Sequence, residues 1–447
     1  MKNFILKLNF LKNNLLIKLI SNSKKLKSKF ELFKNSNLFG FIQGHDYIPK
    51  EKVKIIKSFL KKNDNSIIKK FETKFASLIG DGECFSYASS RMGFYEILNF
   101  LKISSEDEII LVGFTCAVMA NAIIKKGAKI KYCDIDINNL GTCSTSIKKL
   151  INDKTRVIVA QHSFGIPCEI QEISSIAKKY GIFLIEDCAL SLSSKFEGTT
   201  LGNFGNAAIF STDHSKPINT ITGGLVYTQN SALKNYLKKI SKSYPELSTK
   251  NKEYLWQLFI FERNFCNLKN FGKTQLLSLI YRKFFRSLRQ DNNELFDDIS
   301  SKPKQRKTYP AKMPTFCALI GLIEIDRWTE TSKKRVSYLN KFLRLATSKN
   351  LKLPNCYFDN RLKIVPLRLI FFIDISKNNA KKYSTFLDIK SIWFKKPIIG
   401  TNEPLINFYY KYGSCQKAEE LGRSIINLPC CTNENDFIKM LKYLASS

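Results

Sequence analysis

The sequence predicts an α/β protein with a large, doubly wound and mostly parallel sheet, followed by a smaller carboxyl-terminal α+β domain. Between residues 108 and 227, short apolar runs alternate with helical stretches, as in "EIILVGF", "AVMANAIIKKG" and "KIKYCDID". Such strands are apolar throughout because helices cover both faces of a parallel sheet. The alternation stops near residue 232, and an apolar content of 44% excludes a disordered chain.

The first globular elements precede this alternation. Apolar residues at helical spacing predict two helices, in "KEKVKIIKSFLKK" and "SIIKKFETKFASLIG", and Gly80 is the expected stop of the second. "CFSYA" is strand-like and runs into the helical "SSRMGFYEILNFLKI", for which Ser90 is the expected N-cap. The corner between this strand and this helix offers backbone amides to an anionic ligand.

Changes in pattern divide the chain into four parts. We expect a basic amino-terminal extension over 1–49, a large α/β domain over 50–231, a helical basic insertion over 232–308, and a connecting helix with a small domain over 309–447. The insertion contains "KTQLLSLIYRKFFRSLRQ", which reads as a solvated basic face over a packed stripe, with a lid or a contact to an anionic surface as the functional alternative. The last part opens with the long helix "LIGLIEIDRWTETSKKRVSYLNKFLRLA".

The net charge of +34 favours anionic partners, because a positive field concentrates phosphate groups. The lysines are spread along the chain and no nucleic-acid-binding motif is present, so we expect no nucleic-acid partner. The 12 cysteines include no C-x-x-C pair, which argues against a metal cluster and a disulfide scaffold. A reducing cytoplasm is therefore the expected location.

The amino terminus is both apolar and basic. Lys7, Lys12 and Lys18 interrupt its apolar runs, so we expect neither a secretion signal nor a spanning helix. A basic amphipathic helix that lies on an anionic membrane is one expectation. A helix packed on the protein, or a partly disordered extension, is the alternative.

Polar residues follow three strands of the predicted sheet. His162 follows "RVIVAQ", Asp187 follows "IFLIE", and Ser211 follows "AAIF", with Lys216 five residues further on. Ligands of such sheets bind at the carboxyl ends of the strands. We therefore expect the carboxylate and the lysine to project into one crevice.

Chemistry that depends on pyridoxal 5′-phosphate (PLP) needs this pair of groups. A lysine of lowered pKa forms the Schiff base with the aldehyde, and a carboxylate keeps the pyridine nitrogen protonated. The phosphate needs backbone amides at a helix amino terminus and a few hydroxyls. Ser89, Ser90 and Ser211 offer such hydroxyls. A solvated loop lysine and a helix-capping aspartate are the alternatives for the first two groups.

At this point the chain resembles a known family. The runs "FTCAVMANAIIKKGAKIKYCDID", "QHSFGIPCEIQEISSIAKKYGIFLIEDCA" and "GNFGNAAIFSTDHSKPINTITGGLVYT", with the closing "CQKAEELGRSIINLPCCTNENDFIKMLKYL", are similar to the DegT/DnrJ type of fold-type-I PLP enzymes, the nucleotide-sugar aminotransferases. The likeness covers about 50–230 and 309–445, and the order and spacing of several motifs make it specific.

The resemblance implies a role for each matching residue. Lys216 becomes the Schiff-base lysine, and Asp187 the partner of the pyridine nitrogen. The remaining cofactor contacts that it implies are Ser211 at the phosphate or the lysine, Ser89 and Ser90 at the phosphate, and His162 near the cofactor. For His162 a satisfied core histidine is the alternative.

Some positions depart from the family pattern. Cys116 stands where an aromatic residue usually stacks on the cofactor ring, and Leu190 where a Gln or His contacts the ring hydroxyl. Pro310 replaces an asparagine that reaches the neighbouring subunit's phosphate, and Lys312 could compensate. His214, beside the lysine, could contact substrate. Cys116 reads as a small buried residue rather than a nucleophile.

The resemblance implies a PLP-dependent aminotransferase that converts a nucleotide-linked keto sugar to an amino sugar, with glutamate as the donor. It also implies a homodimer and a place in surface-polysaccharide or glycoconjugate synthesis. Two alternatives stay open: a PLP enzyme of this fold with a non-nucleotide keto substrate or another reaction, and a catalytically silent scaffold at a membrane surface.

Overall fold

The computed structural model describes residues 44–266, 309–373, 394, 396–401, 403–430 and positions 434, 435, 437, 438 and 441. The predicted amphipathic amino terminus lies outside these residues, as does the basic helix predicted over 273–290. Within the described ranges, no helix combines the length and the apolar character that a bilayer crossing requires.

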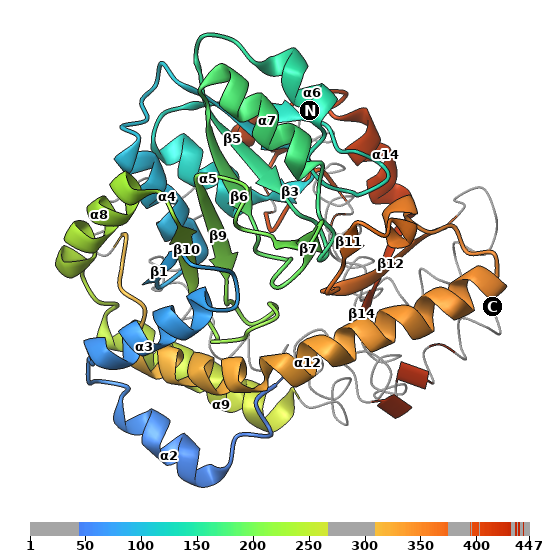
Figure 1. The fold of residues 1–447 in the computed structure, drawn as a ribbon. Helices are drawn as coiled ribbons and strands as arrows, with labels where there is room; N and C mark the ends of the chain where they lie inside the picture. The colour runs from blue at the N-terminus through green and yellow to red at the C-terminus, as the bar shows by residue number, and fades with distance from the viewer. Residues whose placement is uncertain are drawn as a thin grey trace, which may run out of the picture.

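A seven-stranded sheet forms the centre of the protein (Figure 1). In spatial order its strands are β1 (Glu83–Tyr87), β10 (Gly224–Thr228), β9 (Ala207–Ser211), β6 (Phe183–Asp187), β5 (Thr155–Gln161), β2 (Glu108–Val112) and β4 (Lys129–Cys133). The last five strands are mutually parallel, and β10 is antiparallel to both of its neighbours. The predicted mostly parallel sheet is thus confirmed, and its parallel strands all end at the same edge.

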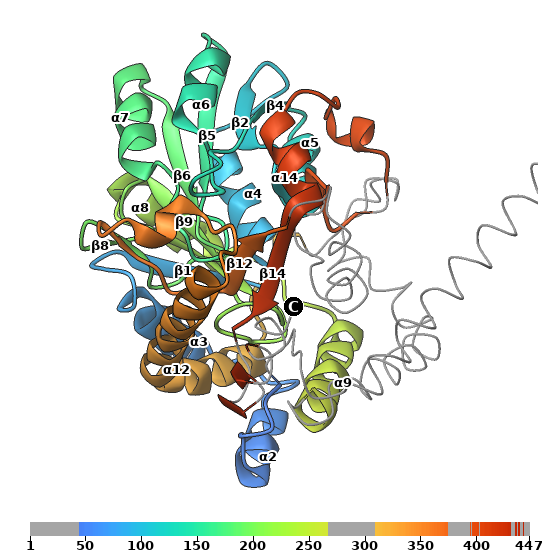
Figure 2. The same cartoon turned by 90° about the vertical axis from the view of Figure 1, so that its right-hand side faces the viewer.

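Helices cover both faces of this sheet. Figure 2 shows α6 and α7 on one side of the strands and α4 and α5 on the other. The helices of the described part before the long connecting helix are α2 (Lys50–Ser58), α3 (Asn65–Ala76), α4 (Ser90–Phe100), α5 (Ala117–Lys125), α6 (Ser144–Leu150), α7 (Ile170–Tyr180), α8 (Ser231–Ile240) and α9 (Thr249–Phe265). In α4 the residues Phe94, Ile97 and Leu98 are fully buried, because helical spacing puts them on one side.

The corner between β1 and α4 differs by one residue from the prediction. The helix begins at Ser90, and Ser89 occupies the N-cap position with extended backbone angles, φ −156° and ψ 153°. The expectation that Ser90 is the cap was wrong, because both serines suit the position by type and sequence alone does not separate them.

A long helix, α12 (Thr315–Ser348), runs from the large sheet to the carboxyl-terminal part of the chain. It packs closely against α3 at Gly321, where an added Cβ would lie 2.4 Å from Phe71 Cε2 and 2.9 Å from Thr220 Cγ2. Only glycine leaves room for this approach. The helix was predicted in this region from its apolar spacing.

The carboxyl-terminal part returns to the large sheet by short strands. Here β12 (Arg368–Phe372) and β14 (Ile425–Pro429) pair antiparallel, and α14 (Gln416–Ser424) precedes β14. The other short strands are β3 (Thr115–Cys116), β7 (Lys195–Phe196), β8 (Thr199–Thr200), β11 (Leu362–Lys363) and β13 (Ile398–Ile399). Because β13 pairs with β3 and β11 pairs with β7, this part of the chain packs beside the carboxyl edge of the sheet.

Candidate active site

Asp187 is the last residue of β6, in the middle of the parallel strands. Its Oδ1 accepts a hydrogen bond of 3.0 Å from the N–H of Ala189. Burial raises the pKa of this carboxyl group, whereas the Ala189 hydrogen bond, Lys216 and His162 act to lower it. A neighbouring cation thus favours the ionised form that a pyridine nitrogen would require.

Lys216 lies in the loop that follows β9, over residues 212–220, which we call the lysine loop. Its N–H donates to the carbonyl of Asp213 at 2.9 Å. Desolvation lowers the pKa of the Lys216 amine, and the nearby Asp213, Cys116 and Asp187 raise it. The structure therefore brings Lys216, Asp187 and Cys116 close enough to influence one another's pKa, and we call these three residues the lysine cluster. The positions of Lys216 and Asp187 after strands predict that these two lie together.

The serines of the predicted phosphate corner gather around the start of α4. Ser211, at the end of β9, pairs with Gly224 of β10. Gly224 in turn lies so close to Ser90 that an added Cβ would be 2.4 Å from the Ser90 Cα. The Ser89 Oγ is buried and has no hydrogen-bond partner in the described part of the chain. A buried hydroxyl without a partner, beside helix N–H groups, suits an anion.

Cys116 occupies the N-cap position of α5 and pairs through β3 with β13. Burial raises the pKa of its thiol, and the positive charges of Lys216 and Arg91 act to lower it. A raised pKa keeps the thiol neutral near pH 7, as expected for a small buried residue. Arg91 was missed in the sequence, although its place directly after Ser90 was a usable signal.

His162 is fully buried, and its ring contacts Glu186. Its Nδ1 accepts from the N–H of Cys168 at 3.1 Å, and its Nε2 lies 3.2 Å from Glu186 Oε2. The carboxylate of Glu186 also accepts three backbone N–H groups, from Gly202, Phe204 and Gly205, at 2.7–2.8 Å. Both ring nitrogens thus have partners within the protein, as the alternative of a satisfied core histidine expects.

His162, Glu186 and Cys188 are close enough to hold one metal ion, since their ligand atoms all lie within 4.8 Å of one another. The hydrogen bonds of His162 explain why these side chains lie close together without a metal ion. Because the Nδ1 lone pair of His162 accepts an N–H, Nε2 is left to donate to Glu186. Burial also raises the pKa of the Cys188 thiol well above its usual range.

The other predicted positions lie in different surroundings. His214 Nδ1 lies 3.1 Å from Glu262 Oε1 of α9, which sequence reasoning did not single out. Leu190 is buried. Pro310 precedes Ala311, whose carbonyl accepts the N–H of Ala88 at 3.0 Å just beyond β1.

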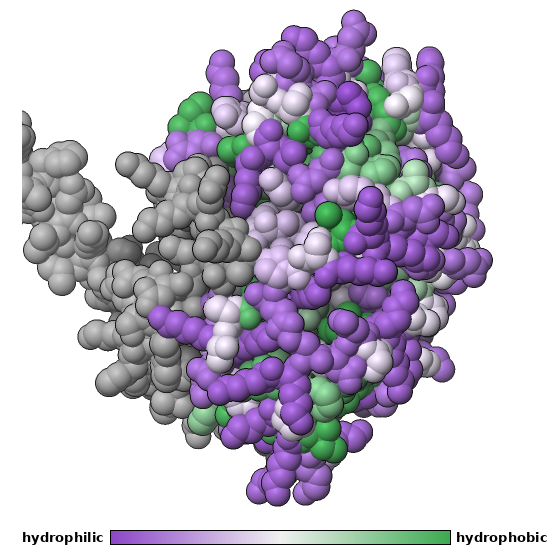
Figure 3. Space-filling view, turned by 90° about the vertical axis from the view of Figure 1, so that its left-hand side faces the viewer, coloured by the Kyte–Doolittle hydropathy of each residue, from purple (hydrophilic) through white to green (hydrophobic). Residues whose placement is uncertain are grey.

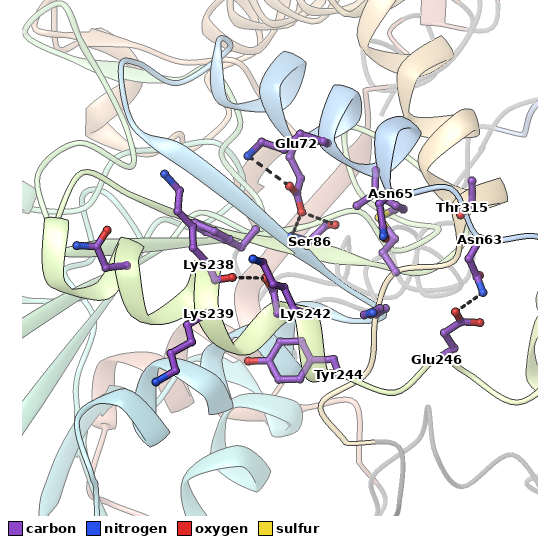
Figure 4. A pocket seen from close by; sticks show the side chains of 17 residues that line it. Asn63, Asn65, Glu72, Ser86, Lys238, Lys239, Lys242, Tyr244, Glu246 and Thr315 are labelled. Carbon is purple, nitrogen blue, oxygen red and sulfur yellow. Dashed lines mark hydrogen bonds and ion pairs between the residues drawn. The ribbon is translucent and has the colours of Figure 1, made fainter.

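Lys312 lines a groove of about 780 Å³ between α3, β1, α8 and the segment that precedes α12 (Figure 4). The groove is basic, with lysines at 69, 238, 239, 242 and 312, and its lining includes none of Lys216, Asp187 and Cys116. Figure 3 shows the face of α3 and α8, which is largely hydrophilic. Lys312 is thus placed in this groove rather than in the lysine cluster.

Parts of the chain are similar to known aminotransferases. Residues 49–270 match the model of the DegT/DnrJ/EryC1/StrS aminotransferase family. GDP-perosamine synthase of Escherichia coli O157:H7 is 34% identical over 166 residues, which cover 37% of this chain and 46% of that protein. The Vibrio cholerae enzyme of the same name is 29% identical over 163 residues, 36% of this chain and 44% of that protein. The chain thus spans less than half the length of these relatives.

Solved structures extend the likeness of fold to most of the chain. Helicobacter pylori PseC, an aminotransferase involved in the biosynthesis of pseudoaminic acid, superposes with a TM-score of 0.67 at 16% identity, over 91% of this chain and 98% of that chain. The PLP-form of the putative sugar aminotransferase Spr1654 from Streptococcus pneumoniae has a TM-score of 0.67 at 15% identity, over 91% and 97%. These matches confirm the predicted fold class. The match of the family model to residues 49–270 shows that the chain belongs to the DegT/DnrJ/EryC1/StrS aminotransferase family.

Proposed function

We propose that the protein is a PLP-dependent aminotransferase that converts a nucleotide-linked keto sugar to an amino sugar. The observation that carries this proposal is the lysine of lowered pKa, Lys216, in one cluster with the buried carboxylate of Asp187 at the carboxyl edge of the sheet. Both groups lie where open α/β sheets bind their ligands.

The residues present fit the cofactor. PLP needs an amine for its aldehyde, a carboxylate for its pyridine nitrogen and an anion site for its phosphate. Lys216 and Asp187 supply the first two. Ser89, with its unpartnered buried Oγ at the start of α4, together with Ser90 and Ser211, supplies the third.

When bound, PLP supplies an electron sink for the α-carbon of an amino donor. Desolvation makes the neutral Lys216 amine available both as a nucleophile and as a base that moves the proton at this carbon. Asp187 would keep the pyridine nitrogen protonated. The N–H groups at the start of α4 would hold the phosphate of the cofactor.

The finer assignments are part of the proposal. A nucleotide-linked keto sugar is supported by the GDP-perosamine synthases and by dTDP-4-dehydro-2,3,6-trideoxy-D-glucose 4-aminotransferase of Saccharopolyspora spinosa, which is 28% identical over 173 residues. We further propose glutamate as the donor, a homodimer, and a role in surface-polysaccharide or glycoconjugate synthesis in the cytoplasm. The four-part division of the chain at 49, 231 and 308, and contact of the basic terminus with an anionic membrane, also stay proposals.

A second candidate is an aminotransferase for a keto substrate without a nucleotide. It is favoured by L-glutamine:2-deoxy-scyllo-inosose aminotransferase of Streptomyces fradiae, 27% identical over 165 residues. Cys116, where the family pattern has an aromatic residue, is consistent with altered substrate contacts. Turnover assays with nucleotide-linked and free keto sugars separate the two candidates.

The first experiment compares the wild type with Lys216→Ala, and with Lys239→Ala as the control for an exposed lysine. PLP should produce a visible absorption band in the wild type and in Lys239→Ala, and glutamate should shift this band. After borohydride reduction, mass spectrometry should find the cofactor on Lys216. Absence of the band from all three proteins would contradict the proposal and favour a silent scaffold, which should then float with anionic vesicles.

A further inference from the structure

One buried carboxylate contacts the lysine loop on both sides of Lys216. Glu262 of α9 is 1% exposed. Its Oε1 lies 3.1 Å from His214 Nδ1, and its Oε2 accepts a hydrogen bond of 3.1 Å from Asn219 Nδ2. The two contacts lie two residues before and three residues after the lysine, so this one side chain fixes both flanks.

The ends of the lysine loop are joined by a second set of contacts. Thr220 Oγ1 lies 2.7 Å from Thr212 Oγ1, and the N–H of Thr220 donates to the carbonyl of Thr212 at 2.8 Å. The N–H of Thr212 donates to the carbonyl of Gly223 at 3.0 Å, which ties the loop to β10. With its base closed in this way, the loop between the threonines is held further by its two contacts with Glu262.

The end of helix α9 that carries Glu262 is held by hydrogen bonds to the segment 44–48. Arg263 donates from Nε and Nη2 to the carbonyl of Ile48, at 3.1 and 2.7 Å. The N–H of Gly44 donates to the carbonyl of Cys266 at 3.1 Å. An added Cβ at Gly44 would lie 2.5 Å from the Glu262 carbonyl oxygen, so the segment 44–48 packs directly on the end of the helix.

Asn219 extends this support to the segment before α2. His45 Nε2 lies 2.9 Å from the Asn219 carbonyl oxygen, and Asn219 Oδ1 accepts the N–H of Ile221 at 2.8 Å. A buried carboxylate is tolerated when donors surround it. Here the donors are His214 and Asn219 of the lysine loop. The contacts that satisfy the Glu262 carboxylate therefore also hold the loop in place.

We propose that Glu262 is the positioning residue of Lys216: it holds the lysine loop through His214 and Asn219 so that the amine meets the cofactor in one geometry. The inference rests on the proposed role of Lys216. A lysine that leaves this geometry by about 1 Å is expected to react 10- to 100-fold more slowly.

The test compares Glu262→Gln with the wild type and with Glu253→Gln. Glu253 lies on the same helix but is exposed, and its Oε1 lies 3.8 Å from Nζ of Lys61, which is exposed too. Glutamine keeps the size of the side chain but offers one acceptor for two donors. We expect about 10- to 100-fold slower attachment of PLP to Lys216 and a weakened or shifted visible band in Glu262→Gln. Glu253→Gln should match the wild type.

Amide hydrogen exchange of the protein without cofactor provides an independent readout. Peptides that cover the lysine loop should exchange faster in Glu262→Gln than in the wild type, and at the wild-type rate in Glu253→Gln. The melting temperatures of the three proteins should be similar. If Glu262→Gln does not fold, His214→Phe removes one of the two contacts at a half-exposed position and should produce a smaller change of the same kind.

Two failures are distinguishable. If the wild type attaches PLP at Lys216 and Glu262→Gln behaves as Glu253→Gln does in attachment, spectrum and exchange, Glu262 does not position the lysine. If the wild type never attaches PLP at Lys216, the proposed function fails and so does the chemical part of this inference. The exchange result then still decides whether Glu262 holds the loop.

Discussion

Strand β6 ends in two consecutive carboxylates, Glu186 and Asp187, which differ in how many hydrogen bonds they accept. Glu186 accepts hydrogen bonds from three backbone N–H groups and faces the buried His162. The carboxylate of Asp187 accepts one hydrogen bond from the described residues, from the N–H of Ala189, and lies near Lys216. The two side chains point to opposite faces because strand residues alternate.

The difference teaches how to recognise a reactive carboxylate in a buried site. Glu186 has its acceptor sites filled by the protein, so it fixes the turn after β8 and has no capacity left for a ligand. Asp187 is buried with a single donor, and burial raises its pKa. An incompletely satisfied buried carboxylate is unfavourable for stability, and this is the one placed toward the lysine.

The strongest test of this comparison is Glu186→Gln. The oxygen of the glutamine amide can accept the N–H groups of Phe204 and Gly205. Its N–H₂ group would then face the N–H of Gly202, and two buried donors would be left without an acceptor. We expect a loss of unfolding free energy of about 3–5 kcal/mol, measured by urea unfolding without cofactor. The exposed Glu253→Gln serves as control. A loss within about 0.5 kcal/mol of that control would show that Glu186 is not a structural carboxylate.

Asp187→Asn should have the opposite profile. The amide cannot keep a proton on the pyridine nitrogen, so the half-reaction with glutamate should slow by about 10³-fold, measured by stopped-flow absorbance. Because the folded pKa of Asp187 lies above its unfolded value, its ionisation opposes folding near pH 7. The variant without cofactor should therefore be at least as stable as the wild type. A loss of stability as large as that of Glu186→Gln would break the comparison.

Glu324 of α12 is a third case, in which a buried carboxyl group accepts no hydrogen bond from the described residues. Burial raises its pKa to about 8, although Arg327 and Arg335 act to lower it. His45 Nε2 lies 3.8 Å away, and burial lowers the pKa of that histidine. Both groups are thus favoured in their neutral forms, so their proximity is not an ion pair at neutral pH.

This case predicts a pH dependence of stability. The folded pKa lies above the unfolded value of 4.5, so the stability contributed by Glu324 is fully present below about pH 4.5 and is lost as the pH rises to about 8. Glu324→Gln, which stays neutral, should lose less stability between pH 5 and 8, by on the order of 2 kcal/mol. Denaturant unfolding at four pH values measures this. Parallel profiles of the two proteins would show that Glu324 is ionised when folded.

Much of the fold could be predicted from the sequence, because the alternation of apolar runs and helices is a local signal. It located the strands and indicated a parallel sheet with helices on both faces. It did not indicate the spatial order of the strands or the reversed direction of β10, since pairing between distant segments leaves no local pattern. The sequence also did not decide whether Ser89 or Ser90 is the N-cap of α4, because the two residues are adjacent and of the same type.

The site was predictable only in part. Lys216 and Asp187 follow strand ends, and both positions point to the carboxyl edge. Glu186 and Asp187 are neighbours of the same charge, and only strand alternation in the folded protein separates their roles. Glu262 lies 48 residues from His214, and no spacing in the sequence connects the two. Such long-range contacts need the folded chain.

The 34 residues of α12 make a rod of about 50 Å. Near its start, Gly321 lies beside Thr220 of the lysine loop, and further along Arg335 donates to the carbonyl of Pro366 at 3.1 Å, next to β12. Such a rod acts as a lever with its pivot at Gly321. A tilt of about 2° there displaces the far end by roughly 1.4 Å. A small rearrangement beside the lysine would thus be magnified into a visible swing of the carboxyl-terminal strands.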